Sequence, residues 1–360
     1  MHDHRLHAIA GCLLGTAIGD AVGLPFEGLS RRRVGRWLRG PLRQRFFFGR
    51  GFCSDDTEHT CMVAQALLTA RSEVDQEWFL HVFTHNLAWR LRLWLLGLPA
   101  GIGLATLRAL LKQWAHLTGH SEGVFSAGNG PAMRSALLGV CHGEDPGFLR
   151  QLVRASTRLT HTDPRAEHGA LAVAWAAHLA SQANPATPAE FIDSFSSLLD
   201  DEESALLPAL KQAADSVQRG ESTLEFAAGI GCSAGVSGFV MHTVPVALHT
   251  CWSHPADYAA AIETVVRCGG DTDTVGAIVG GIIGARVGTE GIPPLWLDRL
   301  WEWPRSRTWL DQLARRLAEA PAVAPHRGAL GLNLPGLLVR NALFMVWVLA
   351  HGFRRLLPPY

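Results

Sequence analysis

Three features of the sequence predict an all-α fold, an orthogonal multi-helix bundle. Apolar residues recur at three- and four-residue spacing along most of the chain, and alternation with a period of two is nearly absent. Apolar residues make up 48% of the 360 residues, which suffices for a large buried core. Proline-containing pairs such as Asp145-Pro146 and Asn184-Pro185 separate the helical segments. Helices are expected over residues 7–24, 56–71, 75–96, 131–140, 147–158, 167–182, 188–199, 233–250, 255–267, 273–288 and 307–319.

The first and tenth of these helices carry glycine at every fourth position. Four interior glycines cost a helix roughly 4 kcal/mol of propensity relative to alanine, so another interaction has to offset that cost. Close backbone contact does so, and we expect helices 7–24 and 273–288 to pack together at the centre of the bundle. Packing of each series against a different neighbour is the alternative; a membrane dimer motif is a weaker one, because both segments carry acids. The series are Gly11, Gly15, Gly19 and Gly23, and Gly276, Gly280, Gly284 and Gly288.

After the first helix, residues 29–45 (LSRRRVGRWLRGPLRQR) hold seven arginines. A solvated basic face is the default interpretation of such a run. A loop that guides or binds a phosphate-bearing substrate is the alternative, because the arginine guanidinium binds phosphate in a bidentate fork.

Acidic clusters stand at the starts of the helices at 56–71 and 273–288, within CSDDTEHTC and GGDTDT. Helix capping explains one side chain at each start, because Ser and Asp are good N-caps and early acids suit the helix dipole. Each cluster, however, offers two carboxylates and a hydroxyl oxygen. Asp20, inside the first helix, is expected to cap or hydrogen-bond a neighbouring backbone rather than to bind a metal.

If the two helix starts meet, four carboxylates share one small space. Like charges about 4 Å apart repel by about 4 kcal/mol per pair at an effective dielectric of about 20. Such groups protonate, separate or bind cations. Oxygen donors without a cysteine or histidine cluster select Mg²⁺, Mn²⁺ or Ca²⁺ over zinc. A pair of divalent metals at the edge of the core would explain why charges precede a buried helix.

The chain is expected to form one helical domain over residues 1–320, an Ala/Pro-rich linker over 321–335 and a hydrophobic C-terminal tail over 336–360. Arg340 and Asn341 interrupt the apolar tail. Docking of the tail onto the bundle or a partner chain is the favoured interpretation, and a peripheral, interfacial membrane anchor is the alternative. No segment is expected to span a membrane, since none holds the ~20 uninterrupted apolar residues required.

Composition limits the partners and the compartment. The formal net charge is zero and the pI is about 7.3, which argues against bulk nucleic acid or an anionic membrane as the main partner. No stable nucleic-acid binding is expected. The seven cysteines form no C-x-x-C pair, so we expect free thiols in a reducing cytoplasm. Lys112 and Lys211 are the only lysines among the basic residues, which a GC-rich bacterial genome explains.

Four stretches carry a family resemblance. They are GCLLGTAIGDAVGLPFEG (11–28), SDDTEHT (54–60), SAGNGPAMR (126–134) with THTDP (160–164), and GGDTDTVGAIVGGIIGARVG (269–288). Together, in this order and spacing, they resemble the ADP-ribosylglycohydrolase family, which includes the dinitrogenase-reductase-activating glycohydrolases, over about residues 8–290. The resemblance implies an all-α fold with a central cleft that holds two metals, usually Mg²⁺ or Mn²⁺.

The resemblance also assigns roles to single residues. Glu27 matches an acid on the mobile loop over the active site, and His161 matches a substrate-lining histidine. Ser126, Gly128, Asn129 and Gly130 match the loop that cradles the phosphates of ADP-ribose through backbone N–H groups. The matching metal ligands, one of whose aspartates bridges the two ions, are Ser54, Asp55, Asp56, Asp271, Asp273 and Thr274.

Two positions depart from the family pattern. Ser54 stands where the family often has threonine. Ala127 stands where some relatives carry an aromatic residue that stacks on the ligand, so this contact is either lost or supplied by Phe125.

The chemistry that the resemblance implies is hydrolysis of the glycosidic bond between an ADP-ribosyl group and its acceptor. Two metals fix the ribose hydroxyls and make a bound water more acidic, while Asp56 or Glu27 takes the proton or orients the ring. ADP-ribosyl-arginine on a protein is the leading substrate. Alternatives are serine-linked or polymeric ADP-ribose, O-acetyl-ADP-ribose or another small-molecule conjugate, ADP-ribosylated nucleic acid, a non-catalytic ADP-ribose-binding immunity protein, and a metal-dependent phosphohydrolase.

Overall fold

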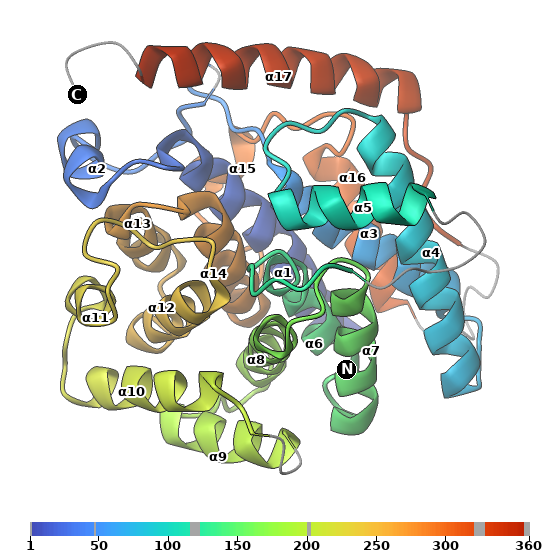
Figure 1. Cartoon of the computed structure of the whole chain (residues 1–360), viewed down its shortest axis with the longest axis horizontal. Coiled ribbons are helices and arrows are strands. Elements are labelled where there is room, and N and C mark those ends of the chain that lie inside the picture. Colours follow the sequence, from blue (N-terminus) through green and yellow to red (C-terminus); the bar gives the residue numbers. More distant parts are fainter. Residues whose placement is uncertain (1, 47, 116–122, 200–202, 320–327, 356–360) are drawn as a thin grey trace.

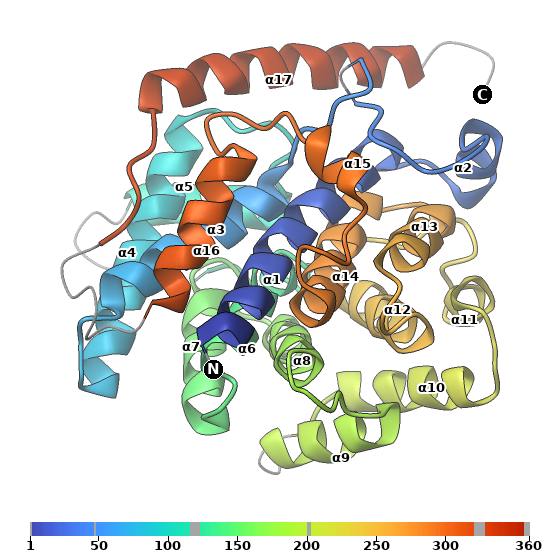
Figure 2. The same cartoon turned by 180° about the vertical axis from the view of Figure 1, so that it is seen from behind.

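The computed structural model describes residues 2–46, 48–115, 123–199, 203–319 and 328–355. These residues form a bundle whose helices cross steeply around two central ones, α1 (His2–Gly23) and α14 (Thr272–Val287) (Figures 1 and 2). Within this part of the chain, extended segments pair only at isolated bridges and form no sheet. The predicted all-α bundle is therefore the observed fold. The predicted linker lies partly, and residues 356–360 of the tail wholly, outside the described residues.

The remaining helices surround this central pair. Two single 3₁₀ turns, Leu24–Phe26 and Ala132–Arg134, follow α1 and precede α6. The other helices are α2 (Arg31–Trp37), α3 (Asp55–Ala70), α4 (Gln76–Leu96), α5 (Leu104–Ala115), α6 (Ala136–His142), α7 (Pro146–Arg158), α8 (Pro164–Ala180), α9 (Pro188–Leu198), α10 (Leu206–Gln218), α11 (Thr223–Gly229), α12 (Val240–Ser253), α13 (Tyr258–Cys268), α15 (Pro294–Asp298), α16 (Arg307–Ala318) and α17 (Leu334–Arg355).

Local sequence fixes many of the helix starts. Asp145 and Asp163 cap α7 and α8, and a proline occupies the first helical position after each, where its missing N–H costs nothing. Thr187 and Ser222 begin α9 and α11 with complete capping boxes, in which a glutamate three residues later returns the hydrogen bond. These caps place the boundaries without help from tertiary packing.

The two glycine-rich helices pack against each other, as predicted. A β-carbon built on Gly15 would overlap the carbonyl oxygen of Gly280, and the reverse substitution would overlap the carbonyl oxygen of Gly15. The backbones therefore touch directly, and Tyr258 donates a 2.6 Å hydrogen bond from its hydroxyl to the Gly15 carbonyl. We call this contact the glycine seam; its members are Gly11, Gly15, Gly19, Gly276, Gly280 and Gly284.

The seam lies within the buried core. The segment Asp3–Phe26 is long and apolar enough to cross a membrane by composition, but 94% of the 18-residue window that meets this criterion is buried inside the bundle. Its apolar character is accounted for by contacts with α14, α3 and α16 on its different sides. The seven cysteines are free thiols.

Three predicted helix starts differ from the structure by five residues or more. The first helix begins at His2 rather than at residue 7, and the helix expected over 131–140 begins at Ala136, after the 3₁₀ turn Ala132–Arg134. The helix expected over 233–250 begins only at Val240. Gly235 has a positive φ, which a continuous right-handed helix excludes. The residues before Val240 instead form bends with isolated bridges at Val236 and Phe239, and they include part of the rim of the cleft described below.

The C-terminal helix α17 lies across one end of the bundle (Figures 1 and 2). Two of its polar residues point inward: Arg340 donates to the Cys53 carbonyl (2.6 Å) and to Glu302 (2.8 Å), and Asn341 donates to the Gly97 carbonyl (2.8 Å). Glu302 also accepts from the Cys53 N–H (3.0 Å). The helix is thereby bonded to the residue that immediately precedes Ser54.

Candidate active site

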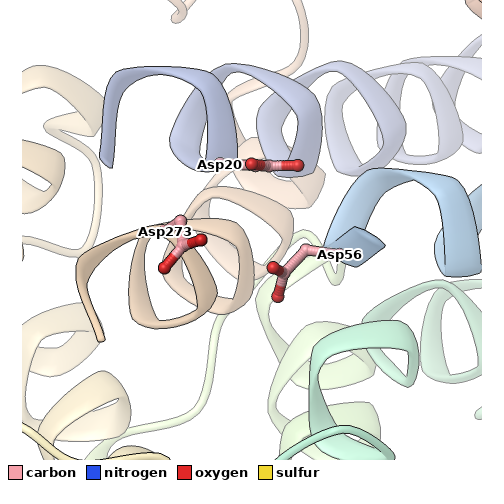
Figure 3. A group of neighbouring side chains, drawn as sticks. All are labelled: Asp20, Asp56 and Asp273. Carbon is pink, nitrogen blue, oxygen red and sulfur yellow. The ribbon is translucent and has the colours of Figure 1, made fainter. Parts of the chain in front are cut away.

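Three buried aspartates from three different helices meet at the centre of the molecule. Asp20 comes from α1, Asp56 from the first turn of α3 and Asp273 from the first turn of α14 (Figure 3). One carboxylate oxygen from each lies within 4.8 Å of the others. The two acidic clusters, separated by more than two hundred residues, therefore converge on one space.

Asp20 binds backbone, as predicted, and also belongs to the acidic group. Its carboxylate accepts hydrogen bonds from the N–H of Ser54 (2.9 Å) and of Thr57 (3.2 Å), and from the Thr57 hydroxyl. These bonds hold the first turn of α3 against α1. The side chain thus fixes where the Ser54–Asp56 segment lies.

Asp56 and Asp273 each retain one oxygen without a hydrogen bond. Ser54 caps α3 by accepting from the Asp56 N–H (3.3 Å) and donates its hydroxyl to Asp56 Oδ2 (2.7 Å), which Thr274 also approaches (3.4 Å). In contrast, Asp56 Oδ1 and Asp273 Oδ1 are buried and have no hydrogen-bond partner among the described residues. Both belong to the aspartate group at the centre of the molecule (Figure 3).

The shared space makes ionisation of these carboxyls unfavourable. Burial, followed by repulsion from the neighbouring acids, raises the pKa of the Asp55, Asp56 and Asp273 carboxyls well above the usual value. Burial also raises the pKa of Asp20 to about 7, although the bonds from Thr57 and Ser54 act in the opposite direction. A bound cation removes this penalty.

The residues present fit a hard divalent cation. All the donors are carboxylate or hydroxyl oxygens, and two carboxylate oxygens are buried without a partner. A buried unpaired carboxylate oxygen costs free energy that a coordinating cation restores. Oxygen-only sites of this kind suit Mg²⁺, Mn²⁺ or Ca²⁺.

A cavity of about 370 Å³ opens above the aspartates. Asp56 itself lies beneath this surface and is almost fully buried. The predicted site residues that line the cavity are Glu27, Ser54, Asp55, Ser126, Gly128, Asn129, Gly130, His161, Asp271, Asp273 and Thr274. Asp55 and Asp271, which come from the two different clusters, thus face one space.

Isolated backbone bridges hold the rim of this cavity together. The turn that carries Glu27 is fixed because the Gly28 N–H donates to the Gly270 carbonyl (2.7 Å), next to Asp271. Gly270 also forms an isolated parallel β-bridge with Val236. The exposed Glu27 carboxylate therefore lies close enough to Asp55 and Asp273 to raise the pKa of each.

The loop at 126–130 is fixed by the same kind of contact. Asn129 donates its backbone N–H to the Gly238 carbonyl (3.0 Å), and its side-chain amide donates to Asp271 (2.7 Å) and to Thr243 (3.0 Å). The Gly128 N–H donates to Ser126 Oγ (3.3 Å). Two N–H groups of the predicted phosphate cradle are thus already engaged within the protein.

His161 lies directly against this loop. A β-carbon on Gly128 would stand 3.0 Å from the His161 Nε2, so glycine permits the close approach. Burial, assisted by the Arg134 cation, lowers the pKa of His161 to about 3, and the ring is neutral at physiological pH. Phe125, suggested as a stacking residue, is 75% exposed and is not among the residues that line the cavity.

Several lining residues were not predicted. Gly238 belongs to the segment assigned to a helix, and α5 with its preceding glycine-rich turn was not expected at all. Phe344 and Val348 reach the cavity from α17, more than fifty residues beyond the last motif. Nothing in the local sequence pattern marks these residues, because only tertiary packing brings them to the cleft.

The fold and the site define an all-α protein with a central cleft whose oxygen donors suit a divalent cation. The family model described as ADP-ribosylglycohydrolase matches residues 1–326, and the chain belongs to this family. Membership supports an ADP-ribosyl hydrolase activity, and the family is generally metal-dependent.

Individual relatives cover most of the chain at low identity. The ADP-ribosyl-[dinitrogen reductase] glycohydrolase of Rhodospirillum rubrum is 26% identical, with 83% of this chain and 91% of the relative covered. The ADP-ribosylarginine hydrolase Tri1 of Pseudomonas putida is 29% identical, with 89% and 81% covered. A solved structure named ADP-ribosylglycohydrolase-related protein complex has a TM-score of 0.61 and 26% identity, covering 88% of this chain and 98% of that chain.

Proposed function

We propose that this protein releases ADP-ribose from ADP-ribosylated substrates, with ADP-ribosyl-arginine on a protein as the preferred substrate. The observation that carries the proposal is the convergence of Asp56 and Asp273 beneath a cavity that Glu27 also lines. The names of the Rhodospirillum and Pseudomonas relatives support the chemistry, and the second supports the arginine linkage. The free thiols support a cytoplasmic location.

The metal would be a pair of Mg²⁺ or Mn²⁺ ions. When bound, such ions fix ribose hydroxyls and increase the acidity of a water. The side chains that would hold them are the six predicted ligands, Ser54, Asp55, Asp56, Asp271, Asp273 and Thr274, and Asp20 would hold the α3 ligands in place through Ser54 and Thr57.

The proton-accepting role falls to Glu27 rather than to Asp56. Glu27 is exposed and lines the cavity where a substrate would lie. Asp56 is buried below the surface, and one of its two oxygens is engaged by Ser54. A general base has to reach the water whose proton it takes, and of these two carboxylates Glu27 is the one that lines the cavity.

The opposite wall of the cleft would hold the substrate. The loop from Ser126 to Gly130 lies at the predicted phosphate position, although two of its N–H groups are engaged. Asn129 is fixed by Asp271 and Thr243 and would keep the loop in place next to the metal ligands. Neutral His161 presents an uncharged ring at the same wall.

Matched variants separate the base from the metal ligands. We expect Glu27→Gln to lower single-turnover hydrolysis by about 10²- to 10⁴-fold while Mg²⁺ binding, measured by calorimetry, is retained. Asp273→Asn should abolish both hydrolysis and Mg²⁺ binding. Full activity and full metal binding in both variants would show that the assignment is wrong.

A substrate panel tests the acceptor. ADP-ribosyl-arginine peptide, serine-linked and polymeric ADP-ribose, O-acetyl-ADP-ribose and an ADP-ribosylated DNA end would be incubated with Mg²⁺, Mn²⁺ or EDTA. We expect free ADP-ribose in the mass spectrum, most rapidly from the arginine linkage and not with EDTA. Binding of ADP-ribose without turnover on any substrate would indicate a non-catalytic binding protein, and release of phosphate would indicate a phosphohydrolase.

A further inference from the structure

The C-terminal helix α17 differs from an ordinary surface helix, because Arg340 and Asn341 face the protein beside the buried Leu337 and Phe344. Arg340 and Asn341 are turned into the protein and are 4% and 3% exposed. The outward side chains between Leu334 and Phe353 are apolar, and no charged residue lies among those whose exposure the structure describes. We call this surface the α17 strip; its large members are Leu338, Val339, Leu343, Val346, Leu349 and Phe353, each at least half exposed.

The strip is long and continuous. Leu334 to Phe353 spans about 30 Å of helix at 1.5 Å per residue. Its neighbours extend it, because Trp301 (53% exposed) and Trp303 (46%) stand beside an apolar cavity of about 520 Å³ that α17 also lines. Soluble proteins rarely expose an apolar area of this extent unless it binds something.

A strongly basic segment adjoins the same end of the molecule. Residues 29–50 hold eight arginines and no acid, and Phe46 and Phe48 of this segment contact Trp347 of α17 at ring-centroid distances of 6.3 and 5.6 Å. Figures 1 and 2 both show α2 and the chain after it beside the C-terminal part of α17. The exposed basic residues of the segment are Arg32, Arg36, Arg39, Arg43 and Arg50.

The zero net charge therefore conceals an uneven distribution. Residues 29–50 and 334–360 contain eleven of the 32 basic residues and none of the 32 acidic ones. These two segments therefore contribute basic residues and no acid, and the compensating acids lie elsewhere in the sequence. Two copies joined through α17 would bring two such basic segments together, which disfavours a second copy as the occupant of the strip.

We propose that the α17 strip and the basic segment at 29–50 together dock this protein onto an anionic lipid bilayer. The apolar side chains would enter the boundary between headgroups and acyl chains, and the arginines would contact the anionic headgroups. The helix would lie on the surface of the bilayer and would not cross the bilayer, because its inner side is bonded to the bundle through Arg340 and Asn341. Aromatic residues at the edge, such as Trp301, suit the interfacial region.

Co-sedimentation with lipid vesicles tests the proposal on the full chain. We expect binding to phosphatidylcholine vesicles that contain about 30% phosphatidylserine, and at least about tenfold weaker binding to pure phosphatidylcholine. Raising the salt concentration from about 0.1 M to about 0.5 M should weaken binding to the anionic vesicles. Equal binding to both vesicle types at all salt concentrations would contradict a contribution of the basic segment to vesicle binding.

Surface variants assign the binding to the two features. The double variant Leu343→Glu with Val346→Glu should weaken vesicle binding at least about tenfold, whereas Val74→Glu, at a fully exposed valine elsewhere, should leave it unchanged. Thermal unfolding of each variant, followed by circular dichroism, checks that the substitutions act at the surface and not through the fold.

A second test variant and its control examine the basic segment at residues 29–50. Arg39→Glu with Arg43→Glu should lower binding to anionic vesicles at least about tenfold, and Arg315→Glu, an exposed arginine on α16, should not. No binding by the unmodified chain would overturn the proposal. So would a dimer in analytical ultracentrifugation that Leu343→Glu dissociates without any vesicle binding, because a second copy would then cover the strip.

Discussion

Asp56 Oδ1 and Asp273 Oδ1 are the atoms on which the site depends. Each is buried without a hydrogen-bond donor, and each belongs to a carboxyl whose pKa is raised by burial and by neighbouring acids. At these positions, a proton or a cation compensates for the lost contact with water. The two occupants therefore compete for the same oxygens.

This competition predicts that metal binding releases protons. A carboxyl with a raised pKa holds its proton to higher pH in the metal-free protein, and that proton has to leave when the cation binds. Because the pKa of Asp20 is about 7 and those of Asp56 and Asp273 are also raised, Mg²⁺ affinity should increase as the pH rises from about 6 to about 8.

Calorimetry in buffers of different ionisation enthalpy measures the released protons. Asp311 offers a matched control, because burial also raises the pKa of this carboxyl, on α16 and outside the aspartate group. Asp311→Asn should leave both the proton release and the Mg²⁺ affinity unchanged. An affinity that falls with rising pH would contradict the explanation.

The residue patterns marked the acidic residues that converge in the structure, but they did not mark every residue that lines the cavity. Paired acids at two helix starts mark Asp56 and Asp273 because a single cap does not need both carboxylates. The position of Asp20 relative to Ser54, 34 residues later, depends on how α1 crosses α3, and no local signal encodes that crossing. Roles such as proton acceptance by Glu27 remain predictions.

At the scale of elements, periodicity and capping predicted most of the long helices. The glycine spacing even predicted which two would touch. The helix expected at 233–250 failed at its start, where Gly235 adopts a positive φ. Helices α2, α5, α10, α11, α15 and α17 were not predicted. Helices α2, α11 and α15 have seven residues or fewer, but α5 and α10 are as long as the predicted α16 and α7 and were missed despite their length.

The glycine seam predicts large effects from adding one carbon. Gly280→Ala should lower the free energy of unfolding by about 3 kcal/mol or more, because its β-carbon would overlap the Gly15 carbonyl and neither backbone can move away easily. Gly35→Ala, on α2, meets no atom within 4 Å and should be neutral or stabilising by up to about 1 kcal/mol. Urea unfolding of both variants compares them; equal stability would refute direct backbone contact.

At the scale of the whole molecule, α17 joins the C-terminal part of the chain to the cleft. Phe344 and Val348 line the cavity, and Arg340 bonds the Cys53 carbonyl beside Ser54. The family match ends at residue 326, so this helix lies beyond the matched region. Its contribution to the cleft follows from tertiary packing and not from any motif.

Loss of the inner contacts of α17 should destabilise the molecule. Arg340→Met leaves the buried Glu302 carboxylate without its cation and should cost about 3–5 kcal/mol of unfolding free energy. Arg307→Met removes an ion pair with Asp298 in which both side chains are well exposed, and should cost at most about 1 kcal/mol. Guanidinium unfolding measures both, and similar losses would show that α17 is not held by this buried pair.

The four-residue glycine repeat also leaves open which turn of α1 faces which turn of α14. Sliding one helix along the other by a single repeat, about 6 Å, would again match glycine to glycine. Such a shift would carry Asp20 away from Asp273 and break the bond from Tyr258 to Gly15. The tyrosine bond is therefore one of the contacts that favour the alignment in which the aspartates assemble.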